Sequence, residues 1–136
     1  SLGLVGSEMC IRDSFPFAPK ALTQAADFYM LERSLNEGDY PDSAAEYILP
    51  ECDYVFITGS AFVNKTAPRL LELSRDAFNV ILGPTTPLAP VLVEDYGVSQ
   101  VTGMLPTSPL AMFEGLSGTD AATAMFEWGH RAELSA

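Results

Sequence analysis

The sequence predicts an α/β sandwich with a mainly parallel sheet, and three observations support this fold class. From residue 27 onward, short apolar runs typical of buried strands alternate with segments of helical period. The spacing between them is short, as in sheets whose parallel strands are joined by crossover helices. The 136 residues, of which 48% are hydrophobic and 18% charged, are enough for one globular domain with its own core.

Four strands are expected from apolar, aromatic and β-branched runs. The second of them is apolar at successive positions, which is typical of a strand covered by helices on both faces. It leads into a polar loop that contains glycine. This arrangement is typical of a buried parallel strand that delivers a loop to a binding crevice. The expected strands are residues 27–32, 52–58, 78–82 and 98–104.

Helices are expected between the strands, where the chain carries recognisable start and stop signals. Ser43 and Glu46 form a capping box at the start of one helix. Thr86 is a suitable N-cap and Pro87 a suitable first residue for a later helix, which Gly97 closes. The expected helices are a weak one within 15–26, and then 43–49, 66–77, 88–96, 108–114 and 119–128.

The helix expected at 66–77 has the clearest amphipathic pattern. Its apolar positions, which include Leu70 and Leu71, predict a stripe packed on the sheet. Arg69 and Glu72 fall on the other face and are expected to point to water.

The loops that follow the strands are the expected binding region. Right-handed crossovers place these loops at one edge of the sheet, and ligands of such sheets bind at that edge. Three of the four loops contain glycine followed closely by hydroxyl residues or proline. The loops are residues 32–40, 58–66, 83–87 and 103–108.

The loop at 58–66 differs at one position from a phosphate-binding P-loop, Gly-x-x-x-x-Gly-Lys-Ser/Thr. Asn64 replaces the second glycine; it tolerates a positive φ, but its side chain hinders close backbone approach to a phosphate. No Walker-B-like run follows, which argues against nucleoside-triphosphate hydrolysis. Amides at the helix start could still bind an anionic group beside Lys65. Alternatively, Asn64 and Thr66 only cap the helix.

We expect two loop walls and one strand end to line the crevice. Glu32 ends the strand expected at 27–32. An acidic residue at the end of the second strand is where Rossmann-type folds hold a ribose hydroxyl, although Glu32 could equally be a solvated strand end. Lys65 would meet negative charge, and hydroxyl groups would donate or accept hydrogen bonds. The candidate ligand-binding residues are Thr58, Gly59, Ser60, Asn64, Lys65 and Thr66 on one wall, Gly83, Pro84, Thr85 and Thr86 on the other, and Glu32.

Soft-metal and nucleophilic sites have little support in the sequence. The chain has one histidine, His130, and no Cys-x-x-Cys spacing, and Cys52 is expected in the core. Asp42 could assist a hard cation, although loop carboxylates are usually solvated. Ser60 is not in a Gly-x-Ser-x-Gly elbow. Catalytic residues, metal ligands and cofactors therefore stay open, with a metal ion or a metal chelate as candidates.

The formal net charge of −11 argues against nucleic acid and anionic membranes as partners. No apolar run approaches the roughly 20 residues that span a bilayer, and the first residues lack the basic region of a signal peptide. A cytoplasmic location is expected by default.

Residues 1–14 do not fit the rest of the chain, because they show neither a clean strand pattern nor a helical period. They resemble translated sequencing-adaptor text, so we interpret them as an artefact or a disordered extension. A natural N-terminal extension is the alternative. On the artefact interpretation only Cys52 is a native cysteine, the domain is residues 15–136, and its first strand is missing.

Five segments, taken in order, resemble the family known as putative heavy-metal chelation, long a domain of unknown function. Two of them, Thr-Gly-Ser-x-x-x-Asn-Lys-Thr and Gly-Pro-Thr-Thr-Pro, are fairly specific. The similarity covers about residues 15–128. The segments are residues 38–46, 53–66, 82–90, 96–97 and 101–103.

The resemblance implies a Rossmann-like three-layer sandwich that follows an enolase-N-terminal-like domain, absent here, with the site between the two. It implies binding of a metal, a metal chelate or an anionic small molecule. An enzyme of metal-cofactor or siderophore-type metabolism, either a transferase or lyase or a nucleotide-dependent enzyme, is the first alternative. A structural module is the second. A domain separated from its partner could also form a homo-oligomer.

Overall fold

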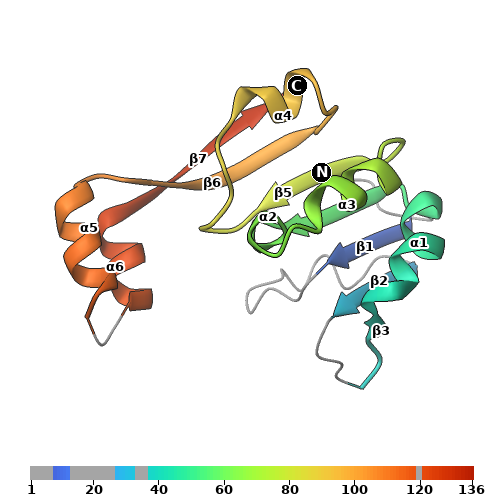
Figure 1. The fold of residues 1–136 in the computed structure, drawn as a ribbon, viewed down its shortest axis with the longest axis horizontal. Coiled ribbons are helices and arrows are strands. Elements are labelled where there is room, and N and C mark those ends of the chain that lie inside the picture. The colour runs from blue at the N-terminus through green and yellow to red at the C-terminus, as the bar shows by residue number, and fades with distance from the viewer. Residues whose placement is uncertain (1–7, 13–26, 33–36, 119–120) are drawn as a thin grey trace.

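The computed structural model describes residues 8–12, 27–32, 37–118 and 121–136. Within them, seven strands form one sheet in the order β3-β2-β1-β4-β5-β6-β7. All neighbouring pairs are parallel except β6 and β7, which are antiparallel. The α/β class and the mainly parallel sheet are therefore confirmed (Figure 1). The strands are β1 (Glu8–Arg12), β2 (Asp27–Glu32), β3 (Tyr40–Pro41), β4 (Tyr54–Thr58), β5 (Phe78–Leu82), β6 (Gln100–Pro106) and β7 (Gly129–Ser135).

Strand β1 occupies the middle of the sheet, between β2 and β4. The expectation that the sheet lacks its first strand is therefore wrong. In the pairing register, Met9 lies opposite Phe28 of β2 and Tyr54 of β4. The hydrogen bonds of such a pairing join backbone groups, which any segment of this length can supply. Residues 1–14 are placed outside the domain in the sequence analysis because they resemble translated sequencing-adaptor sequence. That resemblance carries no information about strand pairing. The foreign origin of that segment stays a prediction.

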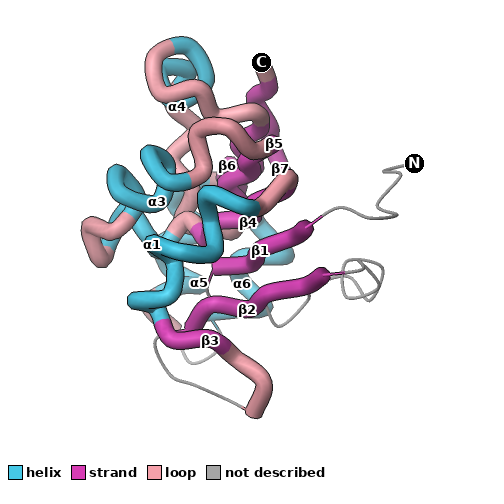
Figure 2. The backbone as a smooth tube through the Cα atoms, turned by 90° about the vertical axis from the view of Figure 1, so that its right-hand side faces the viewer, coloured by secondary structure: helices cyan, strands magenta, loops and turns pink. Residues whose placement is uncertain are grey.

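The strand order reverses between β1 and β4, and this determines which face the helices cover. From β3 onward the chain moves across the sheet in one direction, so right-handed crossovers leave its helices on one face. Figure 2 shows α1, α3 and α4 together on that face. The helix expected within 15–26 lies outside the described residues. The helices of this layer are α1 (Ala45–Ile48), α3 (Ala67–Leu73) and α4 (Pro90–Glu94).

The core lies between this helical layer and the sheet. Leu31, Val55, Ile57 and Ile81 are fully buried strand residues, and they share one hydrophobic cluster with residues of α1, α3 and α4. The alternate positions of β4, Tyr54 and the residues at 56 and 58, are only partly buried. Burial in β4 therefore alternates within the described part of the chain, although the residues are apolar on both faces.

A buried asparagine joins three elements on the same face. Asn79 of β5 is fully buried, and its side chain accepts a hydrogen bond from the Ser99 backbone N–H at 2.9 Å. It donates to the Ser74 carbonyl at 3.3 Å, just after α3. These bonds satisfy the buried amide and connect β5 to the end of α3 and to the start of β6.

Two expected helix starts were wrong, and neither helix has a side-chain cap. The capping box at Ser43 does not form; residues 42–44 are a 3-10 turn, and the helix begins at Ala45 without a side-chain cap. A second 3-10 turn, Leu49–Glu51, carries the chain through its proline. The helix expected at 88–96 begins at Pro90, whereas Gly97 has the positive φ of 67° typical of a helix stop.

An arm projects from the sheet at its β7 edge (Figure 1). We use this name for helices α5 (Pro109–Leu116) and α6 (Ala121–Trp128) together with the β6 and β7 ends that carry them. Strand β6 pairs with β5 only over Gln100–Thr102 but with β7 as far as Pro106. The sequence predicted α5, whose Ser108 side chain accepts from the Ala111 N–H, but it did not predict β7.

Candidate functional site

The loops after β4 and β5, which the sequence predicts as the two walls of the crevice, contact each other at the carboxyl ends of these strands. The Gly59 N–H donates to the Leu82 carbonyl at 2.8 Å. Thr86 lies directly against Gly59, because a Cβ built on Gly59 would be 2.5 Å from the Thr86 backbone nitrogen. A Cβ on Gly103 would be 2.9 Å from the Thr86 carbonyl oxygen. The two glycines therefore allow the loop at 83–87 to pack between the ends of β4 and β6.

The sequence predicts Thr86 as a helix N-cap, but Thr86 caps no helix in the described structure, and its side chain is buried rather than exposed to solvent. The residue is 6% exposed, and its buried Oγ1 has no hydrogen-bond partner in the described structure. Its backbone N–H closes a turn with the Gly83 carbonyl at 3.1 Å, and Gly83 has a φ of 118°. Pro84 and Thr85 form the exposed tip of this turn.

The polar residues of the loop at 58–66 are largely paired with one another. The Ser60 hydroxyl donates to Thr58 Oγ1 at 3.1 Å. Asn64 Oδ1 accepts from the Thr66 hydroxyl at 2.6 Å and from the Thr66 N–H at 3.2 Å. A short helix, α2 (Ser60–Val63), precedes this turn. The side chains thus hold the loop in shape, and α3 begins at Ala67 without a side-chain cap.

The positive φ in this loop belongs to Lys65, not to Asn64. Lys65 has a φ of 66°, whereas Asn64 has a φ of −87°. A residue with a Cβ in the left-handed region costs roughly 1–2 kcal/mol, and the Asn64–Thr66 hydrogen bonds hold the turn that imposes it. The P-loop pattern requires glycine at position 64, but the residue with the left-handed backbone in this loop is Lys65.

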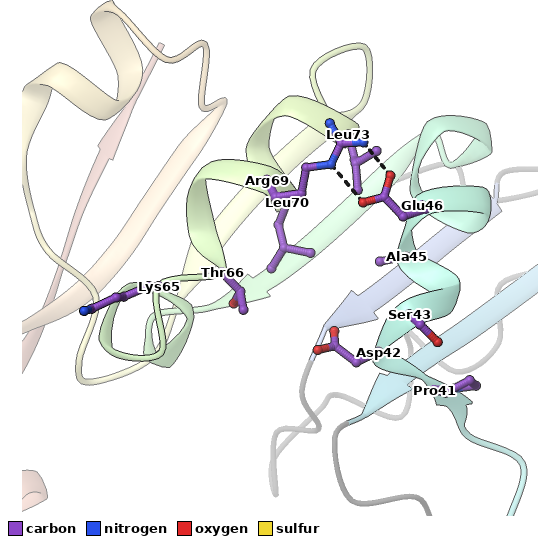
Figure 3. A pocket seen from close by; sticks show the side chains of 10 residues that line it. All are labelled: Pro41, Asp42, Ser43, Ala45, Glu46, Lys65, Thr66, Arg69, Leu70 and Leu73. Atoms are coloured by element: carbon purple, nitrogen blue, oxygen red, sulfur yellow. Dashed lines mark hydrogen bonds and ion pairs between the residues drawn. The ribbon is translucent and has the colours of Figure 1, made fainter.

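A groove of about 630 Å³ runs from the carboxyl edge of the sheet into the space between α1 and α3 (Figure 3). Lys65 and Thr66 line it from the loop after β4, and the other side comes from the end of β3 and the segment that follows it. Figure 3 shows the Lys65 side chain extending away from the other labelled residues. The lining residues are Pro41, Asp42, Ser43, Ala45, Glu46, Lys65, Thr66, Arg69, Leu70 and Leu73.

An ion-pair network crosses the groove. Arg69 Nε donates to Glu46 Oε1 at 2.9 Å, and Arg69 Nη2 donates to the other oxygen of the same carboxylate. Arg69 Nη1 also donates to Glu72 at 2.6 Å, one turn further along α3. These hydrogen bonds hold the pKa of Glu46 below its usual value and raise that of Arg69. The bidentate pair connects α1 and α3 at the exposed rim of the groove.

The sequence predicted only part of this lining. Of the candidate residues, Lys65 and Thr66 line the groove, whereas the others do not. Ser43 and Glu46 had been assigned to a capping box, and Arg69 to a solvated helix face. One signal could have found them. Glu46 and Arg69 have opposite charge and lie early in α1 and α3, which follow β3 and β4 and which right-handed crossovers place on one face.

The remaining candidate residues have different environments. Glu32 ends β2, opposite Pro41 of β3 in the pairing register, and its side chain lies outside the described part. His130 lies in β7 and is exposed, and Cys52 is 6% exposed and belongs to the core, as predicted. Among the described residues, no three His, Cys, Asp or Glu side chains gather to hold a metal ion. No helix of that part could cross a membrane.

A family model described as "DUF364: Putative heavy-metal chelation" matches residues 1–132. An uncharacterized protein of Methanocaldococcus jannaschii is 33% identical over 79 residues, which are 55% of this chain and 30% of that protein. The similarity therefore extends over nearly the whole chain at the level of the family.

Two solved structures, both described as proteins of unknown function from the same family, share the fold. The Desulfitobacterium hafniense protein is 38% identical, with a TM-score of 0.83, and the match covers 98% of this chain and 54% of that one. The Pyrococcus horikoshii protein is 22% identical, with a TM-score of 0.86, over 96% of this chain and 54% of that one. The chain spans about half the length of these solved relatives.

Proposed function

The chain belongs to the DUF364 family, and from that premise we propose that its domain binds a metal chelate or a related anionic small molecule. The binding site is the groove between α1 and α3 together with the loop at its carboxyl-edge entrance. The groove is the observation that carries this proposal. It lies close to the reversal of strand order between β1 and β4, where ligands of open α/β sheets bind.

The composition of the groove favours a ligand that has both polar and apolar parts. Leu70 and Leu73 contribute an apolar floor, and the Thr66 and Ser43 hydroxyls lie beside it. Arg69 is a guanidinium fork that can exchange a carboxylate of the protein for one of a ligand. A chelator rich in carboxylates would compete with Glu46 for this fork.

A metal chelate suits the groove better than a bare ion. Hard and soft ions both need several protein ligands at short distance. The described residues provide no cluster of that kind, so the chelator would supply most of the metal's ligands. The protein would recognise the outer groups of the complex.

The region present only in the longer relatives is a further candidate contributor. We infer that in a protein of the relatives' length it covers the carboxyl edge and completes the site. The chain spans 54% of each solved relative, which leaves room for such a region. The exposed turn at Pro84 and Thr85 and the Lys65 side chain are available for contact with it.

Isothermal titration calorimetry with ferric citrate, citrate alone and Zn²⁺ tests the proposal. We expect ferric citrate to bind, and Arg69→Ala to weaken its binding at least tenfold. Arg75→Ala is the matched control, because Arg75 is exposed, lies two residues after α3 and does not line the groove.

Three outcomes would contradict the proposal. Binding of ferric citrate that is equal in the Arg69→Ala and Arg75→Ala variants would place the site outside the groove. Tighter binding of Zn²⁺ than of the citrate complex would favour a bare-ion site. No binding of any probe to the chain or to the full Desulfitobacterium relative would leave a structural role as the better explanation.

A further inference from the structure

We propose that β7 is a dimerisation edge, at which two copies of this chain pair their β7 strands antiparallel about a two-fold axis at Ala132. This inference does not depend on the ligand proposed above. It rests on the position of β7 in the sheet, on the order of charges along the strand and on the arm that the strand carries.

Strand β7 has an open edge among the described residues. It ends the sheet order, so β6 pairs with one side of it and no described strand pairs with the other. A row of unpaired backbone groups along a seven-residue strand is a template for another strand. Two identical edges can satisfy each other, since an antiparallel pair is symmetric about a two-fold axis.

The charges along β7 select one register. With the axis at Ala132, Arg131 of each copy lies directly opposite Glu133 of the second copy, on one face of the joined sheet. Both residues are exposed. An axis at Arg131 would oppose two arginines, and an axis at Glu133 would oppose two glutamates; like charges in direct opposition are destabilising. The strand is thus complementary to itself only about Ala132.

Both side chains have the capacity for this pairing. Arg131 is exposed and forms no ion pair with a described carboxylate. Glu133 accepts one hydrogen bond, from Gln100 Nε2 at 3.1 Å, which orients its carboxylate on the sheet. A carboxylate has about four acceptor positions, so it can accept the Arg131 guanidinium as well.

The arm carries exposed apolar side chains, which the strand pair itself lacks. In this register Gly129 of one copy lies opposite Ser135 of the other, so each arm extends past the end of the second copy's β7. Leu110, Phe113 and Phe126 are 68%, 70% and 66% exposed in the single chain. Stable interfaces bury roughly 1,200–2,000 Å², and exposed aromatic residues are typical anchors.

Sedimentation equilibrium of the 136-residue chain tests the proposal through a charge swap. We expect a dimer, and we expect Arg131→Glu and Glu133→Arg each to weaken it about tenfold, since each opposes like charges twice. The double variant R131E/E133R restores the opposite-charge pairs and is expected to dimerise within about threefold of the original chain. Far-UV circular dichroism verifies that each variant is folded.

The matched controls separate pairing from net charge. Arg75→Glu changes the charge as Arg131→Glu does, and Asp76→Arg changes it as Glu133→Arg does, on exposed positions after α3. Net-charge repulsion alone predicts that Glu133→Arg strengthens association, whereas pairing at Ala132 predicts that it weakens it. A monomer at all concentrations, a double variant as weak as the single ones, or controls as weak as the β7 variants would overturn the proposal.

Discussion

The body of the sheet and the arm share β6, but they bury their apolar residues to very different extents. In the body, Leu31, Val55, Ile57 and Ile81 are fully buried beneath one layer of helices. In the arm, α5 has no buried residue, and Phe113 is 70% exposed. The two helices of the arm pack chiefly on each other, where Gly115 meets Ala124.

This difference separates residues that stabilise the chain from residues available for binding another surface. A fully buried leucine or isoleucine contributes to the free energy of unfolding of the single chain. An exposed phenylalanine contributes little until a second surface covers it. The comparison predicts that substitutions in the two regions are detected by different measurements.

The largest effect is expected for truncation of the body core. Ile57→Ala truncates a fully buried side chain of β4 and leaves a cavity, so we expect a loss of about 3 kcal/mol in the free energy of unfolding. Phe113→Ala should change that quantity by less than about 0.5 kcal/mol. Urea denaturation at a concentration where the chain is monomeric measures both. Equal losses would remove the distinction between body and arm.

The next effect concerns the contact between the loops that follow β4 and β5. Gly59→Ala places a Cβ 2.5 Å from the Thr86 backbone nitrogen, so the loops must separate, at a cost of about 2 kcal/mol. Gly97→Ala is the control, because no atom lies within 4 Å and only its positive φ makes it unfavourable, by about 1 kcal/mol. A cost at Gly59 no larger than at Gly97 would mean that the loops are not tightly packed.

A third substitution opens the arm without unfolding the body. Gly115→Val forces apart α5 and α6, because a Cβ at this position would be 2.4 Å from the Ala124 Cβ. Hydrogen exchange read by mass spectrometry should show loss of protection in peptides from 109–128 and unchanged protection in β4 and β5. Loss of protection in both regions would show that they unfold as one unit.

The smallest effect concerns the pH dependence contributed by Glu46. Hydrogen bonds from Arg69 lower the pKa of this carboxylate in the folded chain. The resulting stabilisation is present above the ordinary pKa of about 4.5 and is lost as the pH falls through the lowered value. Arg69→Gln should return the Glu46 pKa toward its ordinary value in an NMR titration. An unchanged pKa would mean that the pair does not form in solution, where exposed pairs are weak.

The fold could be predicted wherever the apolar pattern was continuous and the backbone followed it. Strands β2 and β5 match their predicted bounds, because each is a compact apolar run between turn residues. Strand β7 was missed because Gly-His-Arg-Ala-Glu-Leu-Ser alternates weakly and is an exposed edge. Strand β3 is too short, at two residues, to leave a pattern.

The lining of the groove was predicted less well, because it depends on tertiary neighbours. The sheet edge followed from topology, and Lys65 and Thr66 followed from the loop. Arg69 is an ordinary exposed helix residue in the sequence, and only its distance to Glu46 makes it a groove residue. Thr86 has the sequence properties of a cap, yet contacts with two glycines from other strands bury it.

The packing of Thr86 between Gly59 and Gly103 has a consequence for how variation among relatives should be interpreted. A side chain at either glycine would collide with the Thr86 backbone whatever ligand the protein binds. We expect these two positions to stay glycine even in relatives that have changed or lost their ligand. Invariance there would record the geometry of the loops, whereas joint replacement of Glu46 and Arg69 would be the more informative sign of a change in chemistry.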